Sequence, residues 1–500
     1  MSRLRTPALI LTLLAAGPLP TTATAQERTP GEQLPVQEHT LDNGMRLLIL
    51  PRRGAPTVSF VVRYGVGGVH EHLGTTGIAH LLEHLLFKGT TSVGTRDVEA
   101  ERKLFARMDA IHDDVIRARA AGDSARTAEL SEAIESLEDT ARTFVEPNEF
   151  DRILSRAGAR GLNATTTNES TMYFVELPAN RAELWFVLEA DRMTNPVFRE
   201  YYSERDVVME ERRMRVETSP GGLLYEGHLL AAYNVHPYGV PVVGHMSDLE
   251  NLGRRDVGRY FERFYGPNNA VVAIVGDVDP HQVVRWAERY LGPVPRGEEP
   301  PSVLTVEPPQ RGERRVEVIW DAEPAVRIGW HVPDVFHDDA PALTILSSLL
   351  TGGRTSRLYR RLILEDRLAT GVFSSLGPGQ RFPQLFQIDA TPRAPHTTGE
   401  IEEAIYDELE RLSEEGPAES ELQRVRNQIA AGNIRRLQSN LGLAFQLAES
   451  ASLFGDWRTT FRLSERLREV TPGEVSSVLR RYFSRENRTV ATLVRKDGSR

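Results

Sequence analysis

The chain has 500 residues, of which 40% are apolar and 26% are charged, and it contains no cysteine. This length predicts two to four domains of about 150 residues each, and the composition excludes a disordered chain. The formal net charge of −10 argues against non-specific nucleic-acid binding, which normally needs a basic excess. Without cysteine there are no disulfides, thiolate ligands or cysteine nucleophiles, so any metal site must be built from histidine and carboxylate.

The first 25 residues have the pattern of a secretory signal peptide. Arg3 and Arg5 precede an apolar run over 8–16, and the small residues Ala23 and Ala25 precede the expected cleavage point after residue 25. The run is shorter than the roughly 18 to 20 apolar residues that cross a bilayer, which disfavours a membrane anchor. We therefore expect a periplasmic or secreted protein whose stability depends on its hydrophobic cores rather than on disulfides.

The first half of the chain carries strand and helix signals in a mixed order. A hairpin turn at Leu41-Asp42-Asn43-Gly44 comes first, and it is followed by segments rich in β-branched and aromatic residues. In chain order we expect strands over 45–50 and 57–64, a helix over 77–86, a β-like run over 163–177, helices over 181–193 and 203–216, and a strand over 270–275.

Residues 101–146 form a separate helical segment in this pattern. They contain no proline and one glycine, Gly122, and helical spacing of apolar residues continues on both sides of that glycine. The segment therefore predicts a helical hairpin inserted into the first half.

The order of elements recurs after a linker over 293–312, which is rich in proline and charge. Strands are expected over 315–320, 326–332 and 489–494, with a helix over 340–350. Matching Phe60 to Ile328 gives an offset of 268 residues, whereas matching Asn269 to Asn487 gives 218, and the difference of 50 is the length of the hairpin insertion.

These offsets predict an α+β fold of two homologous halves, each a mainly antiparallel sheet covered by helices. The first domain is expected over 36–292, with the helical hairpin inserted at about 101–146, and the second over 313–500.

The motif His80-Leu81-Leu82-Glu83-His84 lies in the expected helix 77–86. Residues four apart share a helical face, so both imidazoles can reach one ion, and Glu83 lies on the same side. Neutral imidazoles suit Zn²⁺, and a catalytic zinc site uses three protein ligands and leaves one position open. The alternative is a solvated polar face, which the neighbouring leucines disfavour.

A third ligand is expected from another element. In the helix over 203–216, Glu204 and Glu211 share one stripe with Val207 and Val208. Two acids on an apolar stripe are costly unless they meet a cation or hydrogen-bond donors, which a zinc site would supply. An exposed acidic helix paired with nearby arginines explains the same pattern equally well.

The stretch from Gly77 to Thr90 resembles the signature of the pitrilysin/insulinase family of zinc peptidases, of the processing-peptidase-like bacterial type. Further segments follow in the family's order, and the resemblance covers nearly the whole mature chain. These segments are Leu162-Asn163-Ala164-Thr165-Thr166 with Thr171 and Tyr173, Glu204 to Glu211, His236-Pro237-Tyr238-Gly239, and Gly352-Gly353 with Ser356-Arg357-Leu358.

The resemblance implies a role for each residue of the motif. His80 and His84 bind zinc, and Glu211 completes the ligand set. Glu83 is the base that activates a water molecule, and Glu204 is a supporting acid. The implied activity is zinc-dependent endopeptidase cleavage of peptides or unfolded proteins.

Asn163 and Ala164 are implied to lie beside the substrate, which in this family joins a sheet edge as an extra strand. One departure from the family concerns spacing: 127 residues separate His84 from Glu211, more than in relatives, and the hairpin accounts for the excess. The hairpin either borders the cleft or serves as a structural spacer.

A second departure is the absence of the Arg-x6-Tyr pair that holds the peptide in active members. The aligned positions are Ile363 and Thr370, and Tyr359 lies only two residues after Arg357. Some bacterial relatives divide zinc and this pair between two subunits, so we expect the zinc-bearing subunit of a heterodimer with a homologous partner. The alternative is a catalytically silent scaffold of the same fold, which the intact zinc motif disfavours.

Overall fold

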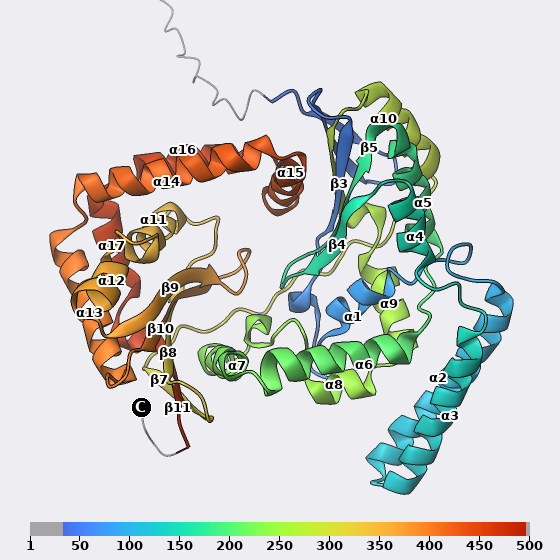
Figure 1. Cartoon of the computed structure of the whole chain (residues 1–500), viewed down its shortest axis with the longest axis horizontal. Coiled ribbons are helices and arrows are strands. Elements are labelled where there is room, and N and C mark those ends of the chain that lie inside the picture. The colour runs from blue at the N-terminus through green and yellow to red at the C-terminus, as the bar shows by residue number, and fades with distance from the viewer. Residues whose placement is uncertain (1–33, 497–500) are drawn as a thin grey trace, which may run out of the picture.

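The computed structural model describes residues 34–496 and folds them into two halves, each built on one sheet (Figure 1). The predicted signal peptide, residues 1–25, lies outside the described residues. Within the described part of the chain, no helix combines the length and apolar character needed to cross a membrane.

The first sheet has six strands in the order β1-β2-β6-β3-β5-β4. Neighbouring strands are antiparallel except β2 and β6, which are parallel. Strand β6 is buried along its whole length because it lies inside the sheet with both faces covered, which explains its continuous apolar sequence. The strands are β1 (Gln37–Thr40), β2 (Arg46–Pro51), β3 (Thr57–Tyr64), β4 (Arg160–Thr166), β5 (Thr171–Pro178) and β6 (Ala270–Gly276).

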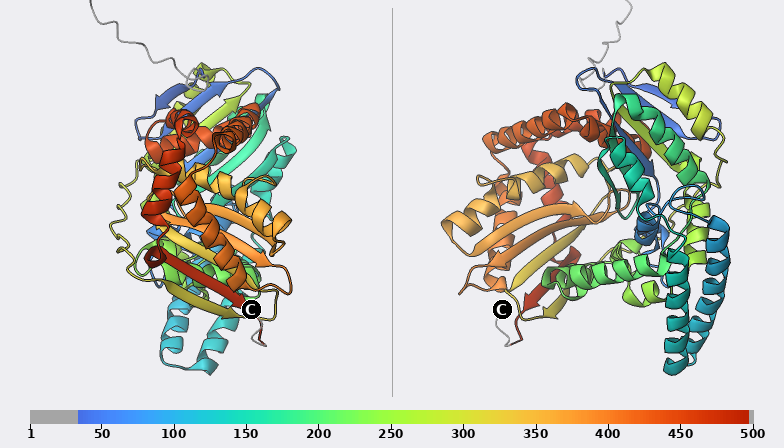
Figure 2. Two further views of the ribbon diagram at one scale, coloured as in Figure 1. Left: turned by 90° about the vertical axis from the view of Figure 1, so that its left-hand side faces the viewer. Right: turned by 45° about the vertical axis from the view of Figure 1, so that its right-hand side comes forward.

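The helices of the first half mostly cover one face of this sheet (Figure 2). They are α1 (Ile78–Leu85), α2 (Val98–Ala120), α3 (Ser124–Arg142), α4 (Glu149–Arg156), α5 (Ala182–Thr194), α6 (Tyr201–Arg212), α7 (Pro220–Ala232), α8 (Met246–Asn251), α9 (Arg254–Phe264) and α10 (Pro280–Trp286).

The second sheet has five strands in the order β7-β11-β8-β10-β9, with β7 and β11 parallel. Its strands are β7 (Arg314–Ile319), β8 (Ala325–Val332), β9 (Ala369–Gly377), β10 (Gln384–Pro392) and β11 (Arg488–Val494). Its helices are α11 (Ala340–Thr351), α12 (Arg357–Tyr359), α13 (Thr398–Glu415), α14 (Glu419–Gln438), α15 (Asn440–Phe454), α16 (Thr459–Glu469) and α17 (Pro472–Tyr482).

The two sheets repeat one plan, which confirms the predicted fold class. The order β2-β6-β3-β5-β4 in the first corresponds to β7-β11-β8-β10-β9 in the second. The side chain of Asn269 donates to the Phe264 carbonyl at 2.8 Å, and that of Asn487 donates to the Tyr482 carbonyl at 2.7 Å. Both asparagines precede the parallel-paired strand, at the offset of 218 residues read from the sequence. The exact domain boundaries stay a prediction.

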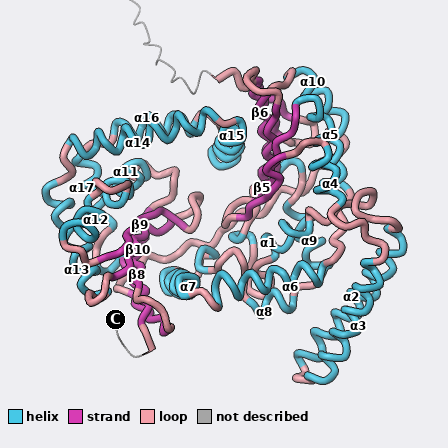
Figure 3. The backbone as a smooth tube through the Cα atoms, viewed as in Figure 1, coloured by secondary structure: helices cyan, strands magenta, loops and turns pink. Residues whose placement is uncertain are grey.

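Two expected elements differ in detail from the structure, and a third is found as expected. The β-like run 163–177 is a hairpin of β4 and β5, because residues 167–170 form a turn between them. The helix expected over 203–216 is α6 followed by a wider helical turn over 213–217. The expected helical hairpin consists of α2 and α3, which join at Gly122 and project from the rest of the molecule (Figure 3).

One helix of each half packs against the sheet of the other half. Helix α15 packs Leu447 and Ala448 against Leu48 and Val61 on the inner face of the first sheet, where Figure 1 shows it beside β3. In return, α7 packs Leu224 against the second sheet. This exchange joins the halves through buried apolar surface rather than through the linker alone.

We expect Leu447→Ala to lower the free energy of unfolding by about 2 to 5 kcal/mol, because it leaves a cavity between α15 and the first sheet. The matched control is Ile434→Ala on α14, whose side chain is 58% exposed, with an effect below about 0.5 kcal/mol. Urea unfolding followed by circular dichroism measures both, and equal unfolding curves would contradict the role assigned to α15.

Candidate metal centre

Helix α1 carries the histidine motif and begins at a tightly packed position. Gly77 precedes the helix with φ +88°, and a Cβ there would lie 2.7 Å from the Val243 carbonyl oxygen, so glycine is required. The buried Glu71 carboxylate accepts hydrogen bonds from the backbone N–H groups of Gly77 and Ala79, each at 2.9 Å. Burial raises the pKa of Glu71 to about 8. These contacts hold the start of α1 in place.

The apolar face of α1 fixes the direction of its polar face. Leu81, Leu82 and Leu85 are fully buried in the first core, as the sequence predicts. His80 and His84 therefore lie on the side of the helix that faces α6.

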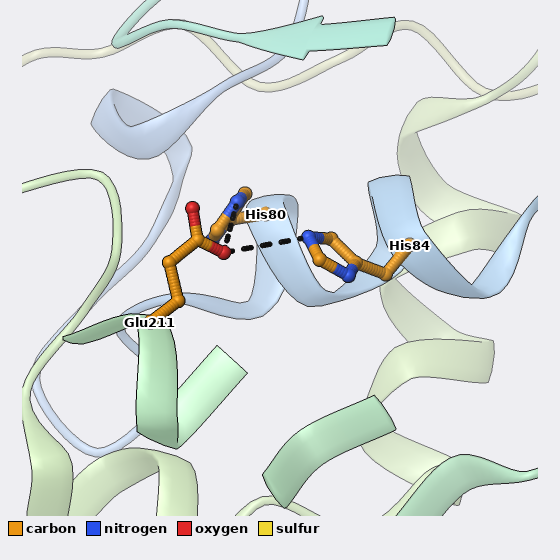
Figure 4. A group of neighbouring side chains, drawn as sticks. All are labelled: His80, His84 and Glu211. Carbon is orange, nitrogen blue, oxygen red and sulfur yellow. Dashed lines mark ion pairs between the residues drawn. The ribbon is translucent and has the colours of Figure 1, made fainter. Parts of the chain in front are cut away.

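His80, His84 and Glu211 meet between α1 and α6, and one ligand atom from each lies within 4.8 Å of the other two (Figure 4). The Glu211 Oε2 atom is 3.6 Å from His80 Nε2 and 3.7 Å from His84 Nε2. The structure thus brings together three residues that the sequence separates by up to 131 positions.

The chemistry of this donor set fits zinc. Burial, together with the nearby His84 and Arg215 side chains, lowers the pKa of His80 to about 3, so its imidazole is neutral at physiological pH. Two imidazoles and one carboxylate are a common ligand set for catalytic zinc, and they leave a fourth position for another ligand. The side chains of His80 and Glu211 are only 12% and 14% exposed, which limits competition from bulk water.

Glu83, the predicted base, lies next to this cluster and reaches the first sheet. Its carboxylate accepts a hydrogen bond from the Thr166 hydroxyl at the end of β4. Burial raises the pKa of Glu83 above its usual value, and the Thr166 hydrogen bond opposes this only in part. The structure therefore places a carboxylate with increased proton affinity between the donor cluster and strand β4.

Glu204 contacts His84 at Nδ1, the ring nitrogen that does not face Glu211. Its Oε2 atom is 3.4 Å from His84 Nδ1, and its Oε1 atom is 2.6 Å from Lys88 Nζ. Burial alone would raise the pKa of Glu204, but the hydrogen bonds from His84 and Lys88 lower it. A charged carboxylate at this position favours the His84 tautomer with hydrogen on Nδ1, which leaves Nε2 free for a metal.

Glu211 is held through its second oxygen, because Arg215 donates to Oε1 at 2.7 Å. Arg215 is thus one of the nearby arginines expected to pair with the acids of this helix, and it binds Glu211, the proposed ligand. The expected apolar stripe of α6 is wrong at Val207, which is 49% exposed, whereas Val208 is fully buried. Glu204 and Glu211 face the cluster, although only part of the stripe is buried.

Strand β4 is an edge of the first sheet and carries Asn163 and Ala164. Asn163 pairs with Phe174 and Ala164 with Tyr173 on β5. In the part of the chain that the structure describes, no strand pairs with the outer edge of β4. This edge can accept the main chain of an extended peptide.

Sequence reasoning missed Lys88, Thr166 and Glu71 as supporting residues. Lys88 lies three positions beyond the end of α1, so helical spacing does not indicate its contact with Glu204. Lys88, Thr166 and Glu71 carry no local signal, because their contacts arise only from tertiary packing.

The second half lacks a free Arg and Tyr at the aligned positions. Ile363 and Thr370 occupy them, as the sequence reads. The nearby Arg357 binds Glu421 at 2.7 Å and Glu408 at 3.2 Å, so its guanidinium is used within the second half.

Two models of one peptidase family match the chain. "Insulinase (Peptidase family M16)" matches residues 48–106 and 138–245, and "Peptidase M16 inactive domain" matches residues 251–429. The chain belongs to peptidase family M16, the insulinase/pitrilysin family. The first model passes over residues 107–137, which lie in the α2–α3 hairpin, and this gap supports its interpretation as an insertion.

Relatives in this family are named zinc proteases. The chain is 29% identical over 426 residues to zinc protease PqqE of Helicobacter pylori, covering 84% of this chain and 82% of that protein. It is 26% identical over 467 residues to an uncharacterized zinc protease of Mycobacterium bovis, covering 91% and 92%.

Solved structures in the same family share the fold. A protease from Helicobacter pylori matches with a TM-score of 0.77 and 26% identity, covering 92% of this chain and 99% of that one. A peptidase M16 inactive domain from Pseudomonas fluorescens matches with a TM-score of 0.72 and 15% identity, covering 92% and 97%, which shows the fold alone.

We expect Lys88→Met to weaken zinc binding about 10-fold or more, because Glu204 loses the ammonium group that holds it against His84. Competition with a chromophoric chelator measures the zinc dissociation constant. The control is Lys103→Met on α2, an exposed lysine away from the cluster, for which no change is expected. Equal affinities in the two variants would show that the contact between Lys88 and Glu204 does not support the centre.

Proposed function

We propose that this chain is a zinc-dependent metalloendopeptidase that cleaves peptides or unfolded proteins. The observation that carries the proposal is the convergence of His80, His84 and Glu211, with Glu83 linking this cluster to the end of edge strand β4. A metal, a base and a peptide-binding edge are the parts that peptide hydrolysis needs.

In this proposal His80, His84 and Glu211 hold the metal. Zinc, when bound there, would supply Lewis acidity toward the peptide carbonyl and toward water. The edge of β4 at Asn163 and Ala164 binds the substrate main chain as an added strand, which favours extended peptides.

Glu83 carries the proton transfer. Its carboxylate accepts a proton from the attacking water and returns it to the leaving amine. Its raised pKa suits this task, because a general base transfers protons best when its pKa lies closer to the pH at which the enzyme works. The Thr166 hydroxyl orients Glu83, while Glu204 and Lys88 orient His84.

A catalytically silent scaffold is the second candidate function. It is favoured by the match of residues 251–429 to a domain that the family describes as inactive. That match concerns mainly the second half, whereas the donor cluster lies wholly in the first. The complete cluster therefore favours an enzyme.

We also propose that the chain works as the zinc-bearing subunit of a heterodimer. The support is the presence of Ile363 and Thr370 where active relatives carry an Arg and Tyr that hold the peptide. A homologous partner subunit with that pair would complete substrate binding.

The proposed location is the periplasm or the exterior of the cell. The support is the signal-peptide pattern of residues 1–25, with cleavage after Ala25. A protein with the same fold, PqqL of Escherichia coli, is described as a periplasmic protease, at 17% identity.

The catalytic assignment is tested by Glu83→Gln and His84→Ala. Glu83→Gln should keep about one zinc per chain and reduce peptide hydrolysis at least about 100-fold, because the amide cannot accept the proton. His84→Ala should lose the zinc. Metal analysis and hydrolysis of an unfolded protein provide the readouts.

Glu210→Gln, on the exposed side of α6, is the matched control and should keep both zinc and activity. A metal-free native protein would favour the scaffold, and activity retained by Glu83→Gln would show that another group is the base.

The partner proposal predicts that the purified chain cleaves peptides more slowly than its mixture with a co-purifying homologue that carries the Arg and Tyr. A mixture containing the Glu83→Gln chain should be inactive, which would assign the chemistry to this subunit. Equal rates with and without the homologue would refute the heterodimer.

A further inference from the structure

A cavity of about 380 Å³ lies at the junction of the two halves. Its walls come from β3, the linker after the first half, the loop between β9 and β10, and the end of α15. The residues that matter here are Arg63, His70, Glu169, Arg381 and Ser452. None of His80, His84, Glu83 or Glu211 lines it, so it is separate from the metal centre.

Arg63 differs from the other buried arginines of the described chain. Arg192, Arg199 and Arg212 each form an ion pair with a carboxylate, from Glu189, Glu101 and Glu226 respectively. Arg63 is only 5% exposed, yet within residues 34–496 it forms no ion pair. Its Nη1 donates to the Ser452 hydroxyl, and its buried Nε has no hydrogen-bond partner.

A buried guanidinium without an ion pair is costly, because it loses hydration and gains only the attraction of carboxylates that do not contact it, here Glu449 and Glu169. Burial lowers the pKa of Arg63 to about 10, so the group remains cationic at neutral pH. The free-energy cost of burying this charge is therefore present at neutral pH, and a bound anion would reduce it.

A second guanidinium lies at the same place. Arg381 donates from Nη2 to the Ser452 carbonyl oxygen at 3.3 Å, so both arginines meet at the end of α15. Arg63 belongs to the first half and Arg381 to the second. An anion between them would contact both halves.

The nearby carboxylates are already engaged. Glu169 accepts hydrogen bonds from the Tyr238 hydroxyl and from the backbone N–H groups of Gln380 and Arg381, the latter two at 2.7 and 2.8 Å. Glu449 accepts from the Gln380 side chain at 3.2 Å. These acids moderate the positive potential but do not bind Arg63 directly.

We propose that this cavity is a carboxylate-binding site formed by Arg63 and Arg381. A carboxylate fits better than a phosphate, because Glu169 lines the same cavity and would repel a second negative charge. Paired guanidinium groups bind a carboxylate through charge-assisted hydrogen bonds.

The carboxylate comes either from the C-terminus of a peptide or from a small organic acid. A larger cavity of about 900 Å³ shares His70 and Pro301 with this one. The two cavities are therefore neighbours, and the larger one is the space that we assign to the rest of a peptide whose C-terminus lies at Arg63. The proposal does not depend on the peptidase activity, since the two sites share no residues.

The test is calorimetric titration of the full chain after metal removal with EDTA, which excludes carboxylate binding to zinc. Three probes are compared: acetyl-Ala-Ala-Ala with a free C-terminus, the same peptide as its C-terminal amide, and propionate. We expect the free acid to bind and the amide not to bind. Propionate binding as tightly as the peptide would identify a small acid as the ligand, whereas weaker binding would identify a peptide C-terminus.

Arg381→Gln and Arg63→Gln should each weaken binding of the free acid about 10-fold or more, because each removes one charge-assisted partner. Arg381 is exposed, so its variant keeps the test valid even if Arg63→Gln fails to fold. The control, Arg263→Gln, lines only the larger cavity and should leave binding of propionate unchanged. Absence of binding by every probe, equal binding of acid and amide, or binding unaffected by Arg381→Gln would overturn the proposal.

Discussion

The approach of helix α6 to helix α1 is the contact on which the candidate metal centre depends. The two histidines occupy one turn of α1, but they meet a carboxylate only because α6 crosses near them and directs Glu211 inward. The same contact brings Glu204 to His84 and Lys88. Four close pairs between α6 and the segment from His80 to Lys88 thus build the candidate ligand set, its orientation and its charge balance together.

The surrounding fold keeps this contact rigid from both sides. The leucines of α1 anchor it in the first core, while Glu71 holds its first turn by backbone hydrogen bonds. Glu83 extends the network to Thr166 on edge strand β4. The proposed base therefore lies between the candidate ligands and the strand proposed to bind a peptide, an arrangement that would couple substrate position to proton transfer.

The second half contributes through its contacts with the first rather than through the donor cluster. Helix α15 packs against the first sheet and helix α7 against the second, so these two helices hold the halves together at their junction. At that junction Arg63 and Arg381 come from different halves and converge on Ser452. The junction thus holds the two halves together and also carries two guanidinium groups that the proposed carboxylate would neutralise.

The sequence by itself determined the local chemistry and the repeat. Helical periodicity places His80, Glu83 and His84 on one face, and apolar patterning with the offset between Asn269 and Asn487 indicates two related halves. The family resemblance implied Glu211 as the third ligand, and the tertiary structure brings it to the histidines. Only the tertiary structure decided that Thr166 holds Glu83 and that Arg63 is buried without an ion pair. The reason is physical: periodicity reports which side of an element is buried, whereas contacts between residues 83 or more positions apart depend on how the elements pack against one another.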